Sequence, residues 1–130
     1  MNYAPLTKRH EEIAKAIVNA AYAVHKELGP GLLESVYEPC FCHELSKQEW
    51  RFQRQVIVPI VYDGITFDEG FRLDVVVEDL VICELKVVDR ILSVHEAQLL
   101  SYMKLTDKRL GFLINFNVPL IKHGIKRFIR

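Results

Sequence analysis

Apolar residues recur at helical spacing through the first part of the chain. In residues 7–28 they return every three or four positions, which predicts an amphipathic helix with one buried stripe made of Ile13, Ala16, Ile17, Ala20, Val24 and Leu28. The sequence Gly29-Pro30-Gly31 should end this helix, because glycine and proline both interrupt a helical backbone.

A second helix is expected at residues 32–47. Its apolar positions are Leu33, Val36, Tyr37, Cys40, Phe41 and Leu45. Pro39 lies inside this segment and has no N–H to donate, so the sequence predicts either a kink or a late helix start at that residue.

After Trp50 the spacing of apolar residues changes to the period of two that is typical of strands. Residues 53–62 lead into Asp63-Gly64, a favoured tight-turn sequence, and residues 65–67 return as a second strand. Pro59 predicts an edge strand or a bulge. Residues 71–77 and 81–88 then form two adjacent strands around Glu78-Asp79.

The last third of the chain predicts one helix and two strands. Ser93 and Glu96 have the spacing of a capping box, and residues 94–104 should form a helix with Ala97, Leu100 and either Tyr102 or Met103 turned inward. Residues 110–115 read as a buried strand and residues 122–130 as a final strand. The order of elements predicts an α/β fold in which residues 1–130 form one domain.

Composition narrows the functional classes. The 130 residues contain 17 Lys and Arg and 17 Asp and Glu, so any affinity for nucleic acid must come from a local patch of charge. The N-terminus lacks an apolar signal-peptide core and no segment is apolar enough to span a membrane, which predicts a cytoplasmic protein. The three cysteines have neither a disulfide framework nor zinc spacing and are expected to be free thiols in the interior.

Three charged residues, Asp74, Glu84 and Lys86, interrupt the most apolar pair of strands. Their neighbours are apolar at both odd and even positions, as in the strands of a sheet that is covered on both faces. A charge buried there is costly unless it is paired or bound to a cation. A three-residue loop at 78–80 would set Asp74 opposite Glu84, whereas a two-residue loop would put them on opposite faces. A metal site and a buried ion-pair network are the two interpretations.

An Asp followed on the next strand by Glu-x-Lys is the pattern of the PD-(D/E)XK nuclease superfamily. Upstream, residues 31–37 read GxxExxY, and downstream Gln98 and Tyr102 form QxxxY. With these motifs in this order, the chain resembles the GxxExxY proteins, a branch of that superfamily similar to RecB-like nucleases. The resemblance implies a restriction-endonuclease-like fold, with a mixed central sheet flanked by helices, and metal-dependent hydrolysis of phosphodiester bonds. No proline precedes Asp74, which is a departure from the named pattern.

The resemblance also implies a role for each matching residue. Asp74 and Glu84 would hold Mg²⁺ or Mn²⁺, with the Leu85 carbonyl as a third ligand. Lys86 would orient or deprotonate the attacking water. Glu34 would be a further catalytic acid, and Gln98 and Tyr102 would steady the site or bind the substrate backbone.

The substrate expected from the resemblance is DNA, and the motifs do not distinguish it from RNA. The rival interpretation is a module that binds nucleic acid or protein and has kept the fold without turnover. A domain of this size has little room for a recognition element, so a homodimer or a larger protein partner is expected to supply specificity. His25 and His95 are expected to be structural. Six basic residues are expected to form either a phosphate-binding rim or ordinary solvated surface: Arg51, Arg54, Lys122, Lys126, Arg127 and Arg130.

Overall fold

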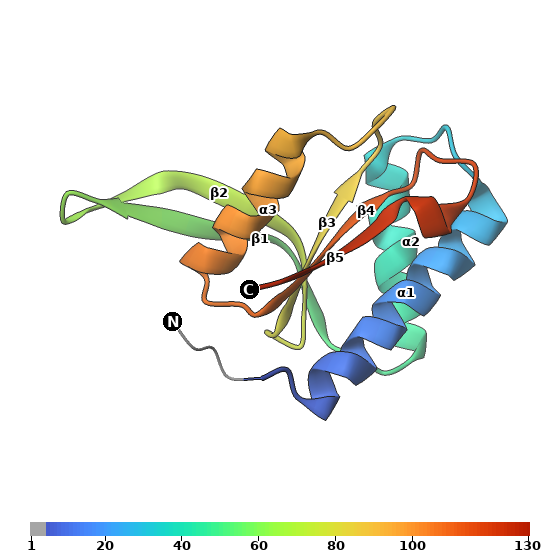
Figure 1. Ribbon diagram of the computed structural model, residues 1–130, viewed down its shortest axis with the longest axis horizontal. Coiled ribbons are helices and arrows are strands. Elements are labelled where there is room, and N and C mark those ends of the chain that lie inside the picture. The colour runs from blue at the N-terminus through green and yellow to red at the C-terminus, as the bar shows by residue number, and fades with distance from the viewer. Residues whose placement is uncertain (1–4) are drawn as a thin grey trace.

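A five-stranded mixed sheet separates two layers of helix in the computed structural model, which describes residues 5–130 (Figure 1). The strands lie in the order of the chain: β1 (Phe52–Tyr62), β2 (Ile65–Val77), β3 (Val81–Lys86), β4 (Leu110–Asn115) and β5 (Ile125–Ile129). β3 and β4 are parallel, and every other neighbouring pair is antiparallel. The predicted mixed sheet flanked by helices is confirmed.

Each face of the sheet has its own apolar core. α1 (Lys8–Leu28) and α2 (Glu34–Lys47) cover one face, where residues such as Ile17 and Phe41 pack on Val75, Cys83 and Phe112. α3 (Ser93–Leu105) covers the other face. Because helices lie on both sides of the sheet, the central strands are apolar at both odd and even positions, as the sequence indicated.

α1 forms as predicted. Thr7 is its N-cap: the Thr7 hydroxyl accepts a hydrogen bond from the His10 N–H (3.2 Å), and the His10 ring accepts one from the Thr7 N–H (3.0 Å). At the other end Gly29 has φ +66° and donates its N–H to the His25 carbonyl (2.8 Å). The predicted stripe is buried except for Leu28, which is partly exposed where the helix ends.

α2 departs from the prediction in its start and in part of its buried face. It begins at Glu34 and runs through Pro39, so a helix start at that proline was wrong. Tyr37 and Phe41 are fully buried as expected, whereas Leu33 is 73% exposed because it precedes the helix as its N-cap. The buried face includes a carboxylate, Glu38, in place of Val36.

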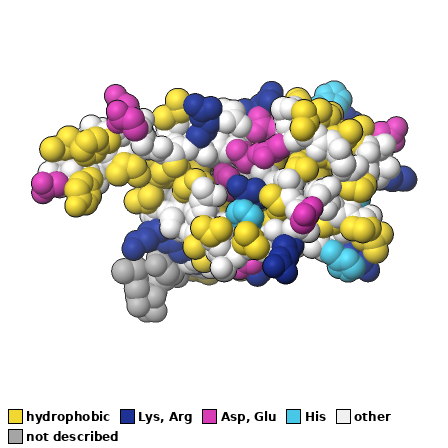
Figure 2. Space-filling view, turned by 90° about the horizontal axis from the view of Figure 1, so that it is seen from above, with side chains coloured by type: hydrophobic (Ala, Val, Ile, Leu, Met, Phe, Trp, Pro, Cys, Tyr) yellow, Lys and Arg dark blue, Asp and Glu magenta, His cyan; other side chains and the backbone are white. Residues whose placement is uncertain are grey.

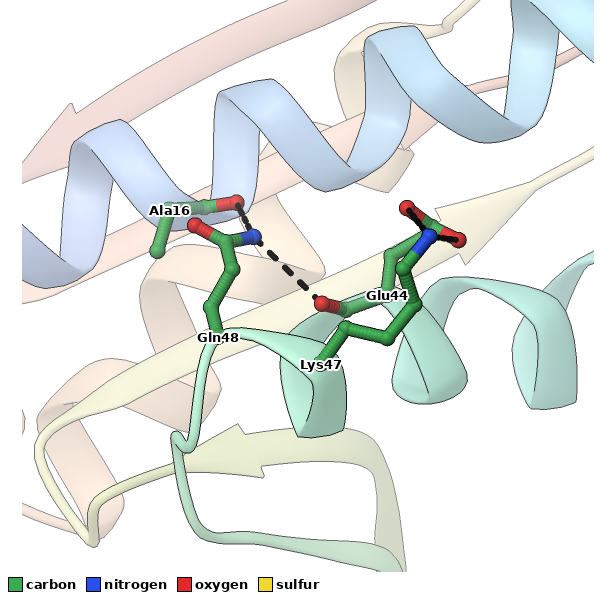
Figure 3. Close-up of polar contacts among 4 residues, drawn as sticks. All are labelled: Ala16, Glu44, Lys47 and Gln48. Atoms are coloured by element: carbon green, nitrogen blue, oxygen red, sulfur yellow. Dashed lines mark hydrogen bonds and ion pairs between the residues drawn. The ribbon is translucent and has the colours of Figure 1, made fainter.

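The C-terminal end of α2 is tied to the middle of α1. The side-chain amide of Gln48 donates to the Ala16 carbonyl (3.5 Å) and to the Glu44 carbonyl (3.4 Å), and Lys47 pairs with Glu44 (3.0 Å) (Figure 3). These bonds are long or exposed, so their contribution to stability is small. Among them, the bond from Gln48 to Ala16 links the end of α2 to α1.

Tyr37 holds the connection between α1 and α2 against the core. Its hydroxyl donates to the Gly29 carbonyl (2.6 Å) and accepts from the Leu32 N–H (3.2 Å). Its ring stacks on Phe116 with the centroids 4.6 Å apart. The last residue of the GxxExxY motif is therefore a structural anchor that determines where α2 begins.

β1 and β2 form a hairpin arm that extends beyond the body of the molecule (Figure 1). Asp63 and Gly64 both have positive φ, as the predicted two-residue turn requires. Pro59 lies on the edge strand at a shift of register between Val58 and Ile60, so both expectations for this proline are confirmed. Apolar side chains remain exposed on the arm (Figure 2), among them Ile57, Val61, Tyr62, Ile65 and Phe67.

The buried face of α3 was predicted correctly at Met103, one of the two alternatives given, and wrongly at Ala97 and Leu100. Leu99 and Met103 are buried, whereas Ala97 and Leu100 are exposed. The reason lies in β4: a Cβ on Gly111 would approach the Met103 sulfur to 2.8 Å and Leu99 Cδ1 to 3.2 Å. The missing side chain of Gly111 makes the space into which these two residues pack.

The ends of two predicted elements also differ. The N-cap of α3 is Leu92, and His95 accepts a hydrogen bond from the Leu92 N–H (2.9 Å), so the Ser93–Glu96 capping box was wrong. Residues predicted as the start of the last strand form a short 3₁₀ helix, η1 (Ile121–His123), before β5.

All three cysteines are free, with Cys42 and Cys83 buried and Cys40 half-buried. Among the described helices, none has the length and hydrophobicity needed to cross a bilayer.

We expect Tyr37→Phe to lower the free energy of unfolding by about 1–2 kcal/mol, because the Gly29 carbonyl and the Leu32 N–H lose their hydroxyl partner. Urea unfolding followed by circular dichroism measures the change. Tyr22→Phe is the matched control, since Tyr22 is 45% exposed. Equal effects of the two substitutions would contradict the anchoring role.

Candidate active site

Asp74 and Glu84 lie opposite each other on β2 and β3. The pairs Val75 with Cys83 and Val77 with Val81 leave residues 78–80 as a three-residue turn, and the same register sets Asp74 across from Glu84. The Asp74 N–H donates to Glu84 Oε1 (3.2 Å), and the Leu85 N–H donates to Asp74 Oδ2 (2.9 Å). The two carboxyl groups therefore meet at the point where the strands separate. Both side chains lie on the same face of the sheet, as a metal site requires.

Glu78 holds the turn that sets this register. Glu78 and Asp79 both have positive φ, which brings the chain back in three residues. The Glu78 carboxylate accepts from the Arg51 N–H (2.6 Å) and pairs with the Arg9 side chain, while the Glu78 N–H donates to the Arg51 carbonyl (2.9 Å). The turn is thus attached to the start of β1 and to α1.

Burial makes the acid pair hold a proton. Glu84 is 4% exposed, and loss of solvation together with the nearby charge of Asp74 raises the pKa of Glu84 to about 8. The pKa of Asp74 is also raised, chiefly by burial. The two side chains are hydrogen-bonded to each other, so near neutral pH the protein without a metal stabilises the pair by sharing a proton.

Lys86 brings a positive charge to the same site. It follows Glu84 by two residues on β3, so both side chains leave the strand on one face. Its charge lowers the pKa values of Asp74, Glu84 and Glu34 against the larger effect of burial. The Lys86 carbonyl accepts from the Phe116 N–H (3.0 Å), which fixes this end of β3 to the chain leaving β4.

Glu34, at the first turn of α2, reaches the acid pair. Burial and the charge of Asp74 raise the pKa of Glu34, and its carboxyl group is hydrogen-bonded to Asp74. Pro39 does not displace it, because the helix already begins at Glu34 and the proline falls five residues later. Figure 1 shows the start of α2, the end of β3 and the start of α3 on the same side of the molecule.

Tyr102 borders the site from α3. Burial and the charges of Glu84 and Asp74 raise its pKa, and the neighbouring Gln98 side chain lowers it. Its ring stacks on Phe71 of β2 with the centroids 4.3 Å apart. The structure therefore brings Glu34, Asp74, Glu84, Lys86 and Tyr102 together, with exposed Gln98 linked through Tyr102. Seen from above, acidic side chains gather beside a basic one midway along the molecule (Figure 2).

Sequence reasoning missed Glu38 and Gln55, which lie next to Glu34 and hold Arg54, a residue it had considered only for a phosphate-binding rim. Glu38 is 5% exposed, and its carboxylate accepts from Arg54 Nε (2.9 Å) and Gln55 Nε2 (2.6 Å). An open pocket of about 330 Å³ is lined by Glu34, Ser35, Glu38, Arg54 and Gln55. The signal that was available is the spacing of Glu34 and Glu38, four residues apart on one face of a helix.

The two histidines are structural, as expected. The His25 ring is hydrogen-bonded to the Val118 carbonyl (2.7 Å) and packs α1 against the segment after β4. His95 bonds to the Leu92 N–H at the start of α3.

Comparison with protein families agrees with this arrangement. Residues 11–128 match the family profile described as the PD-(D/E)XK nuclease superfamily. The chain belongs to this superfamily. Neither the curated proteins nor the solved structures gave a match. Membership in the PD-(D/E)XK superfamily indicates a metal-dependent nuclease, a hydrolase that acts on phosphodiester bonds.

The carboxylates of this PD-(D/E)XK protein fit a hard divalent cation that keeps part of its water shell. Within residues 5–130, no three or more His, Cys, Asp and Glu side chains form a group able to enclose a metal. Mg²⁺ is ordinarily bound by one or two carboxylates and several waters, so Asp74 and Glu84 are a sufficient protein ligand set. Since the Leu85 N–H is directed toward Asp74, the Leu85 carbonyl faces the same edge of β3.

Most of the basic residues considered for a phosphate-binding rim are paired with acids in this PD-(D/E)XK fold. The ion pairs are Arg54–Glu38, Lys126–Glu96, Arg127–Glu11 and Arg130–Asp107. Arg54 differs from the other three because its acid, Glu38, is buried and lies beside the site.

We expect the metal-free protein to lose stability as pH rises. Below about pH 4.5 Glu84 is protonated in both the folded and the unfolded chain, and its full contribution is present. Between there and its folded pKa of about 8, the unfolded chain releases the proton first, so the free energy of unfolding falls. The loss, on the order of a few kcal/mol, should be largely absent in Glu84→Gln.

Urea unfolding at several pH values in the presence of a chelator measures this dependence. Glu27→Gln, a substitution at an exposed position of α1, should behave like the wild type. An identical pH dependence in Glu84→Gln and the wild type would show that the acid pair is not the group that titrates.

Proposed function

We propose that the protein is a Mg²⁺- or Mn²⁺-dependent nuclease that hydrolyses phosphodiester bonds in DNA. The observation that carries the proposal is the meeting of Asp74 with Glu84 across β2 and β3, with Lys86 on the same face of β3. The GxxExxY segment at residues 31–37 and the Gln98–Tyr102 pair support a place in the RecB-like GxxExxY branch.

Asp74 and Glu84 are the proposed metal ligands, with the Leu85 carbonyl as the third protein ligand. When bound, the cation would polarise the phosphate and lower the pKa of a water molecule. The protein contributes the positions of the oxygens, since the Asp74 and Leu85 N–H groups hold the two carboxyl groups in place before any cation is present. This preorganisation avoids rearrangement during the reaction.

Lys86 is the proposed group that orients or deprotonates the attacking water and offsets charge on the phosphate. Its carbonyl is fixed by the Phe116 N–H, and its side chain leaves β3 on the same face as that of Glu84. Glu34 would act as a further acid from α2, because its carboxyl group lies close enough to Asp74 for the charge of Asp74 to raise its pKa. Gln98 and Tyr102 would hold the substrate backbone from α3.

Residues 1–130 are proposed to act as a single domain. Helices cover both faces of its sheet, and the loops around the acid pair are short, so recognition of a particular target would need a second copy or a larger protein. A module that binds nucleic acid without cutting it is the competing function, and the experiments below separate the two.

Lys86→Ala should reduce cleavage by a factor on the order of 10² or more, because a positioned acid–base and electrostatic group is lost. Metal affinity should persist or increase slightly, since a positive charge beside the cation is removed. Calorimetric titration with Mn²⁺ and cleavage of single-stranded and duplex DNA measure the two effects.

Lys104→Ala, at an exposed position of α3, is the matched control for Lys86 and should cleave like the wild type. Unchanged cleavage by Lys86→Ala would remove this residue from the mechanism. Failure of the wild type to cleave DNA or RNA with either metal would favour the binding module.

Asp74→Asn should abolish metal binding while leaving the metal-free fold unharmed or slightly more stable. An asparagine oxygen can still accept from the Leu85 N–H, and the negative charge that Asp74 places beside Glu84 is removed. Calorimetry and urea unfolding in chelator check the two halves of this expectation. Marked unfolding of the variant would favour a structural ion-pair network instead.

A further inference from the structure

Glu38 is a buried carboxylate whose hydrogen bonds come from two consecutive residues of β1. Arg54 donates through Nε and Nη2 to Glu38 Oε2, both at 2.9 Å. Gln55 Nε2 donates to Glu38 Oε1 at 2.6 Å. Both carboxylate oxygens are therefore satisfied within the protein, and the guanidinium is held in one orientation.

The backbone of β1 is distorted to make this arrangement. Consecutive side chains of a regular strand point to opposite faces, yet Arg54 and Gln55 reach the same carboxylate. Gln55 has φ +52°, a conformation that a residue with a side chain seldom adopts and that costs free energy. Since Arg54 pairs with Val75 and Val56 with Leu73, this distortion lies directly opposite Asp74.

Arg54 keeps donors free for a ligand. The Glu38 side chain is 7% exposed and that of Arg54 is 43% exposed, so the acid is buried while the guanidinium reaches solvent. A guanidinium has five N–H donors, and Glu38 engages those of Nε and Nη2 on one edge. Arg54 lines the pocket of about 330 Å³, so its remaining N–H donors are available to a ligand there.

The pocket is continuous with the acid pair through Glu34. This residue lines the pocket and also hydrogen-bonds Asp74. A polyanionic strand that places one phosphate at Asp74, Glu84 and Lys86 would bring a neighbouring phosphate toward the pocket, where Glu34 and Glu38 are both acidic. A fixed guanidinium is the side chain suited to that position, because its planar fork matches a phosphate.

We propose that Arg54 binds a backbone phosphate of the nucleic acid strand next to the phosphate that is cut, and that Glu38 and Gln55 position its guanidinium. The proposal rests on the proposed function in that it takes a nucleic acid as the ligand. It adds a substrate contact from β1, on the side of the acid pair away from β3. Arg54 is a substrate-binding residue, whereas Glu38 and Gln55 act through it.

The test is the binding of a fluorescent single-stranded DNA oligonucleotide, measured by anisotropy in chelator at several salt concentrations. Loss of one phosphate contact should weaken binding about tenfold for Arg54→Gln and reduce the slope of log Kd against log salt by about 0.7. Arg127→Gln is the matched control, because Arg127 also pairs with a helical glutamate, Glu11, at 2.8 Å, on the distant strand β5. Its affinity and slope should equal those of the wild type.

Gln55→Gly tests the positioning role separately from stability. Glycine adopts positive φ without strain, which offsets part of the cost of losing the amide's hydrogen bond to Glu38, so the variant should still fold, while affinity for the oligonucleotide falls severalfold because the amide is lost. A purely structural Gln55 would leave Kd unchanged in this variant.

If Arg54→Gln does not fold, Arg54→Lys keeps the charge and should retain the salt slope but lose affinity.

The outcomes separate this proposal from the nuclease assignment. Wild-type affinity and salt slope in a folded Arg54→Gln variant would overturn the phosphate contact. Binding without cleavage in Mg²⁺ or Mn²⁺, with a slope that depends on Arg54, would support the contact and reject the nuclease. A wild type that binds neither DNA nor RNA would overturn this proposal.

Discussion

The register between β2 and β3 is the constraint on which the site depends. Side chains alternate between the faces of a sheet, so a slip of one residue would move Glu84 away from Asp74 and would turn the apolar residues of β3 to the wrong cores. The three-residue turn excludes that slip, and Glu78 secures the turn through its bonds to Arg51 and Arg9. An exposed ion pair that looks peripheral therefore helps to determine the geometry of the buried acids.

The fold tolerates the buried acids by a series of local adjustments, each of which involves a different element. Backbone N–H groups of Asp74 and Leu85 donate to the two carboxyl groups, Lys86 supplies charge, and the pair retains a proton. Nearby, Gln55 holds a strained backbone to satisfy Glu38. Stability alone would favour apolar residues at these positions, so the cost agrees with the proposed role of these oxygens in binding a ligand.

The parts of the structure that local chemistry determines were predictable from the sequence. The Asp63-Gly64 turn and the Pro59 bulge follow from backbone preferences of those residues. The pairing of Asp74 with Glu84 depends on the length of the loop at 78–80, which the sequence left open and the structure sets at three residues. The phase of α3 was not predictable, because it depends on the space above Gly111, a residue of another element. The buried position of Glu38 was not predictable for the same reason, because it depends on donors from another element, β1. One of these donors, Gln55, requires a backbone conformation that cannot be predicted from the sequence.

The proton shared by Asp74 and Glu84 has a consequence for charge balance in the interior. With the pKa of Glu84 at about 8, this carboxyl group is mostly protonated near neutral pH. Coordination of the proposed divalent cation would require the loss of that proton, so the site would gain one unit of positive charge instead of two. Occupancy by the proposed cation would thereby be coupled to the proton concentration and would increase in mildly alkaline solution.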